Sequence, residues 1–372
     1  MSSTTTISVG CFPYAPGFNP YQRLITESIE SAGAIVSRIP PAKWFPLHCA
    51  IAAETDILHL DWPHDWYNGK NAVIRFLKTC MYLQGLRGLR TKPVIWTAHN
   101  LIAHDSPNPK REHRMIQKLI NQCQGLMVLS EASRKLLLAE YQIPKDVSIK
   151  KIYHGHYIDC YTNQITRKDA RKKLGIASSE FVYLLPGTIK PYKGHVEAID
   201  AFRSFSTESD TLLIAGGGDY RFIDELRTLA EKNTSTIRGK VKFLPGFIAD
   251  EEFQNFYNAA DITVLPFRQV LNSGSLLLAM SFGSPVIAPK MGSIPEIAMA
   301  EYFFGYSPSS NSESTTANLA TAMIHSKHKL TQTVNTQLQK KQIIEFTKDK
   351  YDWKKAGVLL RDWYIKLLDK DA

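Results

Sequence analysis

Short apolar runs alternate with helix-like segments along the whole chain. The runs in the first half are "TISVGCF", "AIVSRI", "DILHL", "PVIWTAH", "GLMVLS" and "VSIKKIYHG", and those in the second half are "FVYLLPG", "DTLLIAGGG", "VKFLPGF", "DITVLPF" and "SPVIAPK". Apolar strands separated by helices predict parallel sheets whose two faces are covered by helices. We therefore expect an α/β chain built from two α/β/α units.

The alternating pattern stops and restarts near the middle of the chain. The stretch "YIDCYTNQITRKDARKKLGI" is polar, and we expect the linker near residues 158–170. A chain of 372 residues is long enough for two ordinary domains. We expect the first domain over residues 1–160 and the second over 161–345. Two such units tend to bind ligands at the carboxyl ends of their strands, in the cleft between the domains.

The segment "LLPGTIKPYKGH" in the second half has the features of an anion site. An apolar strand ends at Pro186, Gly187 allows a tight turn, and a helix is expected to start near Gly194. The N–H groups at a helix start attract phosphate, and Lys190 and Lys193 add full positive charges. It is not a Walker loop, because GxxxxGK[ST] is absent. The alternative interpretation is a solvated basic loop.

A second helix start with similar features follows in "LPFRQVLNSGSLLLAMSFG". The residues Asn272, Ser273, Gly274 and Ser275 lie between a strand and a helix, where they offer capping oxygens and a close approach to the backbone. Arg268 adds a charge nearby. The alternative interpretation is ordinary helix capping. The nearby "GGG" run does not match GxGxxG, so we do not predict a dinucleotide site.

Imidazole and carboxylate groups gather at the strand ends of the first half. His59 and Asp61 fall on one face of the strand in "DILHLDWP", and His99 follows the strand in "VIWTAH". General-base chemistry needs such groups. Metal binding is the rival interpretation, but the spacings match no known ligand run and the five cysteines are scattered without a CxxC pair. An ordinary structural role is the third interpretation of each histidine.

Positive charge clusters in the segment 68–92, within a chain of net charge +10. Its basic residues alternate with apolar ones and resemble a basic amphipathic helix suited to an anionic membrane; they are Lys70, Arg75, Lys78, Arg87, Arg90 and Lys92. A half-buried helix with a solvated cationic face is the alternative. Nucleic acid is not an expected partner, because no binding motif accompanies the charge.

No uninterrupted apolar stretch is long enough to cross a membrane, and no secretion signal is recognisable at the start. We therefore expect a cytoplasmic protein that can associate with the inner face of the membrane.

Together these segments resemble the GT-B glycosyltransferases, specifically the family-four-like (group 1) members. Lys193 matches the lysine of the family's Lys-Gly pair that binds the donor diphosphate, and Thr188 falls at its other basic position, so Lys190 is the expected substitute. The segment "LPGFIADEEFQNFYNAADITVLPF" resembles the part around the nucleotide base, which implies Phe247 and Ile248 beside that base. The C-terminal residues 346–372 resemble the family's helix that crosses back onto the first domain. The implied fold is two Rossmann-like domains.

The chain departs from the retaining members of the family at one place. They carry two glutamates at positions that correspond here to Val270 and Leu278, which cannot bind a hydroxyl group as a carboxylate does. The resemblance then implies inversion by direct displacement, with Asp61 as the first candidate for the general base and His59 and His99 as alternates. The pair "WP" after Asp61 is similar to that of exopolysaccharide-assembly members.

The resemblance implies the substrates and partners. The donor is a GDP- or UDP-sugar, the acceptor is a saccharide or a polyprenyl-linked saccharide, and no metal or other cofactor is needed if lysines and helix starts hold the diphosphate. Two other functions stay open: a GT-B sugar-nucleotide epimerase, which uses no acceptor, and a non-catalytic binding protein at the membrane periphery.

Overall fold

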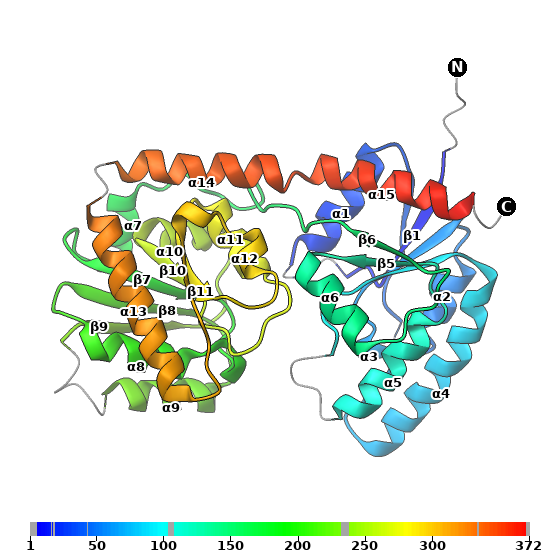
Figure 1. The fold of residues 1–372 in the computed structure, drawn as a ribbon, viewed down its shortest axis with the longest axis horizontal. Coiled ribbons are helices and arrows are strands. Elements are labelled where there is room, and N and C mark those ends of the chain that lie inside the picture. Colours follow the sequence, from blue (N-terminus) through cyan, green and yellow to red (C-terminus); the bar gives the residue numbers. More distant parts are fainter. Residues whose placement is uncertain are drawn as a thin grey trace. The chain divides into compact units, whose positions relative to one another are not determined.

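Two compact units make up the chain. The computed structural model describes residues 6–15, 17, 19–42, 44–102, 108–231, 238–332 and 335–369. One unit comprises Met1–Gly155 with Tyr351–Ala372, and the other comprises His156–Lys350. Each contains a six-stranded parallel sheet with helices packed on it (Figure 1). The predicted α/β fold with two parallel sheets is therefore confirmed.

The N-terminal unit has the strand order β2-β1-β3-β4-β5-β6. Its central strands are buried at nearly every position, as their apolar sequences require. The strands are β1 (Ser8–Phe12), β2 (Ile35–Arg38), β3 (Ile57–Leu60), β4 (Val94–Thr97), β5 (Gly125–Val128) and β6 (Ser148–Lys151). The helices are α1 (Tyr21–Ser31), α2 (Pro46–Ala52), α3 (His64–Tyr67), α4 (Ala72–Gly88) with the 3₁₀ turn η1 (Leu89–Thr91), α5 (Pro109–Ile120), α6 (Glu131–Glu140) and α15 (Trp353–Leu368).

The C-terminal helix α15 belongs to this N-terminal unit and packs beside α1 (Figure 1). The two helices touch closely, because a Cβ atom at Gly357 would lie only 2.0 Å from the carbonyl oxygen of Ser28. Trp363 Nε1 donates a hydrogen bond to Ser148 Oγ at 3.0 Å. The buried face of α15 therefore completes the core that covers one side of the first sheet.

The C-terminal unit has the strand order β12-β11-β10-β7-β8-β9. The strands are β7 (Phe181–Pro186), β8 (Asp210–Gly216), β9 (Lys240–Pro245), β10 (Ile262–Val264), β11 (Val286–Pro289) and β12 (Phe303–Tyr306). The helices are α7 (Arg167–Leu174), α8 (His195–Phe205), α9 (Tyr220–Glu231), α10 (Phe253–Ala259), α11 (Gly274–Ser281), α12 (Ile294–Ile297), α13 (Ser312–Thr331) and α14 (Thr336–Lys350), with 3₁₀ turns η2 (Pro191–Lys193), η3 (Asp250–Glu252) and η4 (Ala300–Tyr302).

Several elements were not evident from the sequence pattern. The helix α7 begins inside the polar stretch expected as the linker, because Thr166 caps it by accepting a hydrogen bond from Asp169 N. The long helices α13 and α14 carry weak apolar periodicity. Among the described residues, no helix combines the length and the apolar character needed to span a bilayer.

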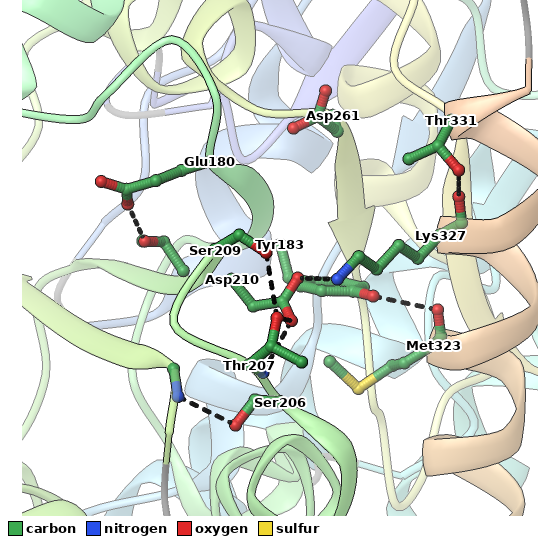
Figure 2. Close-up of polar contacts among 12 residues, drawn as sticks. Glu180, Tyr183, Ser206, Thr207, Ser209, Asp210, Asp261, Met323, Lys327 and Thr331 are labelled. Atoms are coloured by element: carbon green, nitrogen blue, oxygen red, sulfur yellow. Dashed lines mark hydrogen bonds and ion pairs between the residues drawn. The ribbon is translucent and has the colours of Figure 1, made fainter.

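Buried carboxylates hold the amino edge of the second sheet together (Figure 2). Asp210 is fully buried at the start of β8, and its Oδ2 accepts hydrogen bonds from Thr207 N at 2.8 Å and Thr207 Oγ1 at 2.7 Å. Its Oδ1 lies 2.6 Å from Lys327 Nζ on α13. This carboxylate therefore links the sheet to the helix that covers it.

We expect Asp210→Ala to lower the free energy of unfolding by about 2–3 kcal/mol, because it leaves Lys327 and the Thr207 donors without their buried acceptor. Urea-induced unfolding measures this change. Asp224→Ala is the matched control, because the Asp224 side chain is 73% exposed and lies 3.7 Å from Arg227. The control should change the free energy by less than about 0.5 kcal/mol. Equal effects of the two substitutions would contradict the role given to Asp210.

Candidate functional site

A row of glycines ends the central strands of the second sheet. Gly187, Gly216 and Gly246 directly follow or end β7, β8 and β9, with φ values of 94°, 148° and 138°. A Cβ atom at Gly216 would lie 2.1 Å from Gly187 O, and Gly246 N donates to Gly216 O at 3.1 Å. The glycines thus let three neighbouring backbone segments approach one another at the carboxyl edge of the sheet.

The segment after Gly187 brings a lysine back to this edge. Ile189 N donates to Gly217 O at 2.6 Å, and η2 then leads into α8. Gly194 has a φ of 71°, and a Cβ atom there would lie 1.9 Å from Pro266 O. Only glycine therefore allows α8 to start against the segment that follows β10.

Lys193 presents an ammonium group without a matching carboxylate. Its Nζ lies 3.3 Å from the position that a Cβ of Gly187 would occupy, and 6.0 Å from the ring centre of Phe267. Within the described part of the chain, no carboxylate forms an ion pair with it. Burial lowers the pKa of Lys193 to about 8, and the neighbouring Lys190 adds to the shift. Such a group favours an anionic ligand, which would restore the stability of its charged form.

The second predicted anion segment lies at the start of α11. Ser273 is buried, and its Oγ accepts a hydrogen bond from Leu276 N at 3.2 Å, as capping predicts. Asn272, Gly274 and Ser275 are half-buried around this helix start. A Cβ at Gly274 would lie 3.2 Å from the Tyr157 hydroxyl, a neighbour that the sequence did not indicate.

The segment after β10 connects the two anion segments. Pro266 contacts Gly194, Phe267 faces Lys193, and Arg268 N donates to Tyr192 O at 2.8 Å. The structure therefore brings the Lys193 turn and the segment leading into α11 to the same edge of one sheet.

Arg268 adds less charge than its sequence position suggests. Its Nε lies 2.6 Å from Glu197 Oε1, and Glu197 is buried in the first turn of α8. The guanidinium is therefore largely neutralised by this carboxylate. Lys193 is the stronger candidate for contact with an anion.

The remaining predicted donor residues follow the ends of β7 and β9. Phe247 directly follows Gly246 and is 72% exposed, whereas Ile248 is half-buried. Thr188 is exposed and Lys190 is half-buried in the loop after β7. Because β7, β8 and β9 are neighbours in the sheet, both loops lie at its carboxyl edge.

In the N-terminal unit, Asp61 and His99 form a pair at the carboxyl edge of the first sheet. The Asp61 Oδ1 accepts from His99 Nε2 at 2.7 Å, and the two side chains are 6% and 10% exposed. The His99 ring stacks on Trp62 with centroids 4.2 Å apart, and its edge-to-face contact with Tyr21 is 4.8 Å. The aromatic rings therefore fix the imidazole that orients the carboxylate, and neither ring was recognised from the sequence as part of the site.

His59 is placed differently from the other two candidates. One ring nitrogen lies 2.6 Å from the Tyr364 hydroxyl and the other 2.5 Å from Thr97 Oγ1. The side chain is buried, and burial lowers its pKa. Because both nitrogens have protein partners, the geometry favours a structural link between β3, β4 and α15.

A cavity of about 680 Å³ lies in the N-terminal unit, and neither Asp61 nor His99 is among the residues that line it. Trp62 contributes to its wall and also stacks on His99, so the cavity adjoins the Asp61–His99 pair. Its other lining residues include Pro13, Gln22, Asp65, Trp66 and Lys78. Aromatic faces with a few polar groups are typical of a small-molecule site. Across the described ranges, no cluster of three or more His, Cys, Asp or Glu side chains could hold a metal ion.

Comparisons with known proteins show what this chain is similar to. Residues 166–340 match the family "Glycosyl transferases group 1". The chain is 25% identical over 274 residues to the GDP-mannose:glycolipid 4-beta-D-mannosyltransferase of Xanthomonas campestris pv. campestris, a match that covers 73% of this chain and 70% of that enzyme.

Solved structures with a similar fold cover almost the whole chain. Sucrose-phosphate synthase from Thermosynechococcus elongatus has a TM-score of 0.72 and 18% identity, over 98% of this chain and 100% of that one. Anabaena HepE in complex with UDP and glucose has a TM-score of 0.71 and 18% identity, over 97% of this chain and 100% of that one. The chain is therefore a glycosyltransferase of the GT-B fold, and its residues 166–340 match the group 1 glycosyltransferases.

Proposed function

We propose that the protein transfers a sugar from a GDP- or UDP-sugar to a saccharide or polyprenyl-linked acceptor, with inversion, in the synthesis of a polysaccharide or glycoconjugate. The observation that carries the proposal is the Lys193 ammonium, which lacks a carboxylate partner within the described residues and lies at a glycine-lined sheet edge. The Xanthomonas relative is named for a GDP-mannose donor and a glycolipid acceptor, which supports both substrate classes.

The donor diphosphate is expected to bind at the carboxyl edge of the second sheet. Lys193 and Lys190 supply positive charge, and the N–H groups at the start of α11 supply further donors. Phe247 offers an exposed aromatic face to the nucleotide base. These groups stabilise the negative charge that builds up on the departing diphosphate, so the proposed reaction needs no metal ion.

The acceptor is expected to bind in the cavity beside Trp62. Asp61 takes the proton of the acceptor hydroxyl while that oxygen attacks the anomeric carbon. The bond from this carbon to the diphosphate oxygen breaks, and the diphosphate leaves with the electron pair. His99 orients the carboxylate through the 2.7 Å hydrogen bond. Inversion is supported by the β-linkage named for the Xanthomonas relative, because an α-linked donor gives a β-product by a single displacement.

Incubation with GDP- and UDP-sugars, with and without membrane extract, tests this function. Transfer predicts that the nucleoside diphosphate is released and that the sugar appears in extract lipid only when donor and extract are both present. Conversion of the donor sugar without extract would instead indicate an epimerase. Binding without any turnover would indicate a non-catalytic protein.

The pH dependence of nucleotide binding tests the role of Lys193. Above pH about 8 the free protein loses the Lys193 charge, whereas a bound diphosphate favours the charged form. The dissociation constant of the diphosphate should therefore rise as pH increases above about 8, by up to tenfold per pH unit. Calorimetric titrations between about pH 7 and 9 measure this. Lys193→Arg should flatten the profile, because guanidinium stays charged; a flat wild-type profile would contradict the assignment.

We also propose that α4 and α5 contact an anionic membrane. α4 exposes Val73 (68%), Phe76 (68%) and Leu77 (41%) near its start. Exposed basic residues also lie just before α4 (Lys70), at its far end and in η1 (Arg87 and Arg90), and on α5 (Lys110, Arg114 and Lys118). Exposed apolar side chains in a region that also exposes several cationic ones suit the interface of a bilayer rich in anionic lipid.

Three basic residues expected on this face are directed elsewhere, among them Lys92, whose Nζ donates to Ala53 O. Lys78 Nζ donates to Asp65 O at 2.8 Å, and Arg75 is half-buried with its Nε shielded from solvent. The basic residues offered to a membrane are therefore fewer than the sequence suggests.

Phe76→Ser with Leu77→Ser should weaken binding to phosphatidylserine-containing vesicles by about tenfold or more. Each substitution removes the favourable free energy of burying an apolar side chain in the bilayer. Co-sedimentation with vesicles measures this. Leu338→Ser is the control, because Leu338 is 52% exposed on α14 in the other unit. Equal binding of the double variant and the wild type would reject the membrane contact.

A further inference from the structure

A second cavity lies at the amino edge of the C-terminal sheet, opposite the strand ends that carry Lys193. Its volume is about 450 Å³, within the range of small-molecule sites. Asp261 and Pro285, which directly precede β10 and β11, form part of its wall. The rest comes from the segment before α7 and the first residue of α7, the end of α10, the turn after α11, Leu330 near the end of α13 and the start of α14. None of the predicted donor or acceptor residues lines it.

Lys340 provides a buried positive charge in this wall. Its aliphatic stem packs on Gly283, where a Cβ would lie 2.4 Å from Lys340 Cγ. The ammonium donates to the amide oxygen of Asn258, a neutral acceptor. Burial lowers the pKa of Lys340, because the contacts of the charged form do not fully compensate for its loss of solvation.

The carboxylate in the wall does not neutralise Lys340. Asp261 is bound by two guanidinium groups, from Arg167 at 2.5 Å and Arg171 at 2.8 Å, and it also accepts from Val182 N at 2.7 Å. Lys341 adds a further cation to the lining, and its Nζ lies 3.7 Å from Glu345 in an exposed pair. The cavity wall therefore carries a surplus of positive charge.

The wall also holds an unsatisfied hydrogen-bond acceptor. Gln339 lines the cavity and is only 6% exposed, and its Oε1 has no hydrogen-bond partner among the described residues. The neighbouring amides are ordered, because Asn258 Nδ2 donates to Asn163 Oδ1 at 2.8 Å and to Ile165 O at 3.2 Å. A buried acceptor without a donor is unfavourable, so a ligand hydroxyl would stabilise this site.

A polar network at the same sheet edge differs from the cavity wall in that its charges and hydrogen bonds are paired. Asp210 pairs with Lys327 and accepts hydrogen bonds from Thr207 (Figure 2). Lys340 and Gln339 instead lack an anion and a donor within the described residues. The cavity has room for a ligand that supplies both an anion and a hydrogen-bond donor.

We propose that this cavity binds a sugar phosphate. The phosphate lies against Lys340 and Lys341, and a sugar hydroxyl donates to Gln339 Oε1. The amides of Asn163 and Asn258 and the rings of Tyr257 and Phe282 surround the sugar. The site is separate from the donor site, and the inference stands whether or not the proposed transfer reaction is correct.

Calorimetry on the full chain with excess UDP and GDP tests the proposal, with glucose 6-phosphate, mannose 6-phosphate, glucose and inorganic phosphate as probes. We expect a hexose phosphate to bind more tightly than glucose or phosphate alone. Lys340→Met should weaken that binding by about tenfold or more, and Lys341→Gln, at an exposed position, by a smaller factor. Lys193→Ala and Lys348→Gln should leave it unchanged, because neither residue lines the cavity.

Three results would overturn the proposal. The first is that no hexose phosphate binds at millimolar concentration. The second is that binding is lost in Lys193→Ala but kept in Lys340→Met, which would place the probe at the donor site. The third is equal affinity for glucose and glucose 6-phosphate, which would exclude recognition of an anion. Thermal unfolding of each variant checks that it is folded. If Lys340→Met does not fold, Lys341→Gln still tests the proposal.

Discussion

Lys193→Ala is expected to lower kcat/KM for sugar transfer by about 100-fold or more, because it removes a preorganised positive charge from the departing diphosphate. The Lys193 ammonium has no carboxylate partner within the described residues, so its loss leaves no protein anion unpaired. The fold should therefore be retained, and the loss should appear in both kcat and nucleotide affinity. Steady-state kinetics with the active donor, together with calorimetry of the diphosphate, measure the two effects.

Lys348→Ala is the control for this experiment, because Lys348 is exposed on α14. It should keep kcat/KM within about twofold of the wild-type value. Near wild-type activity of Lys193→Ala would place the diphosphate elsewhere and would count against the donor site at the glycine row.

Asp61→Asn is expected to lower transfer by about 10³-fold or more, because an amide cannot accept the acceptor's proton. The substitution keeps the shape of the side chain and an oxygen that can accept from His99 Nε2. Nucleotide affinity should stay within about twofold, because Asp61 lies in the other unit from the donor site. Measurement of transfer and of diphosphate binding on the same preparation separates these effects.

Asp146→Asn, at an exposed position of the same unit, should transfer normally. If Asp61→Asn keeps substantial activity, the general base is another group, and His99 is the next residue to replace. A loss of both transfer and thermal stability would instead indicate that Asp61 stabilises the folded protein.

The sequence supported a definite expectation wherever local chemistry decides structure. Apolar runs of strand length separated by helical segments specify parallel sheets, and they occur here in both units. The glycine after β7 and the glycine before α8 could also be recognised, because their positive φ values reflect the turns that their neighbours require. The helix cap at Ser273 follows from the same local rules.

Side-chain partners that come from distant segments could not be predicted. His59 stood beside Asp61 as a candidate base, but its partner Tyr364 is 305 residues away on α15, whose packing no local pattern reveals. Likewise, Glu197 neutralises Arg268 across 71 residues. The orientation of Lys78 toward Asp65 also depends on how α4 meets α3.

By itself, the sequence determined the two parallel sheets and the glycine-flanked turn that carries Lys193, because strand burial, helix starts and glycine turns depend on neighbours along the chain. Only the tertiary structure decided that Asp61 pairs with His99 between aromatic rings, that His59 is enclosed by Tyr364 and Thr97, and that Lys340 and Gln339 face a cavity. The physical reason is that burial and pairing of a side chain depend on which remote elements pack against it, and the order of residues specifies this only through the complete fold.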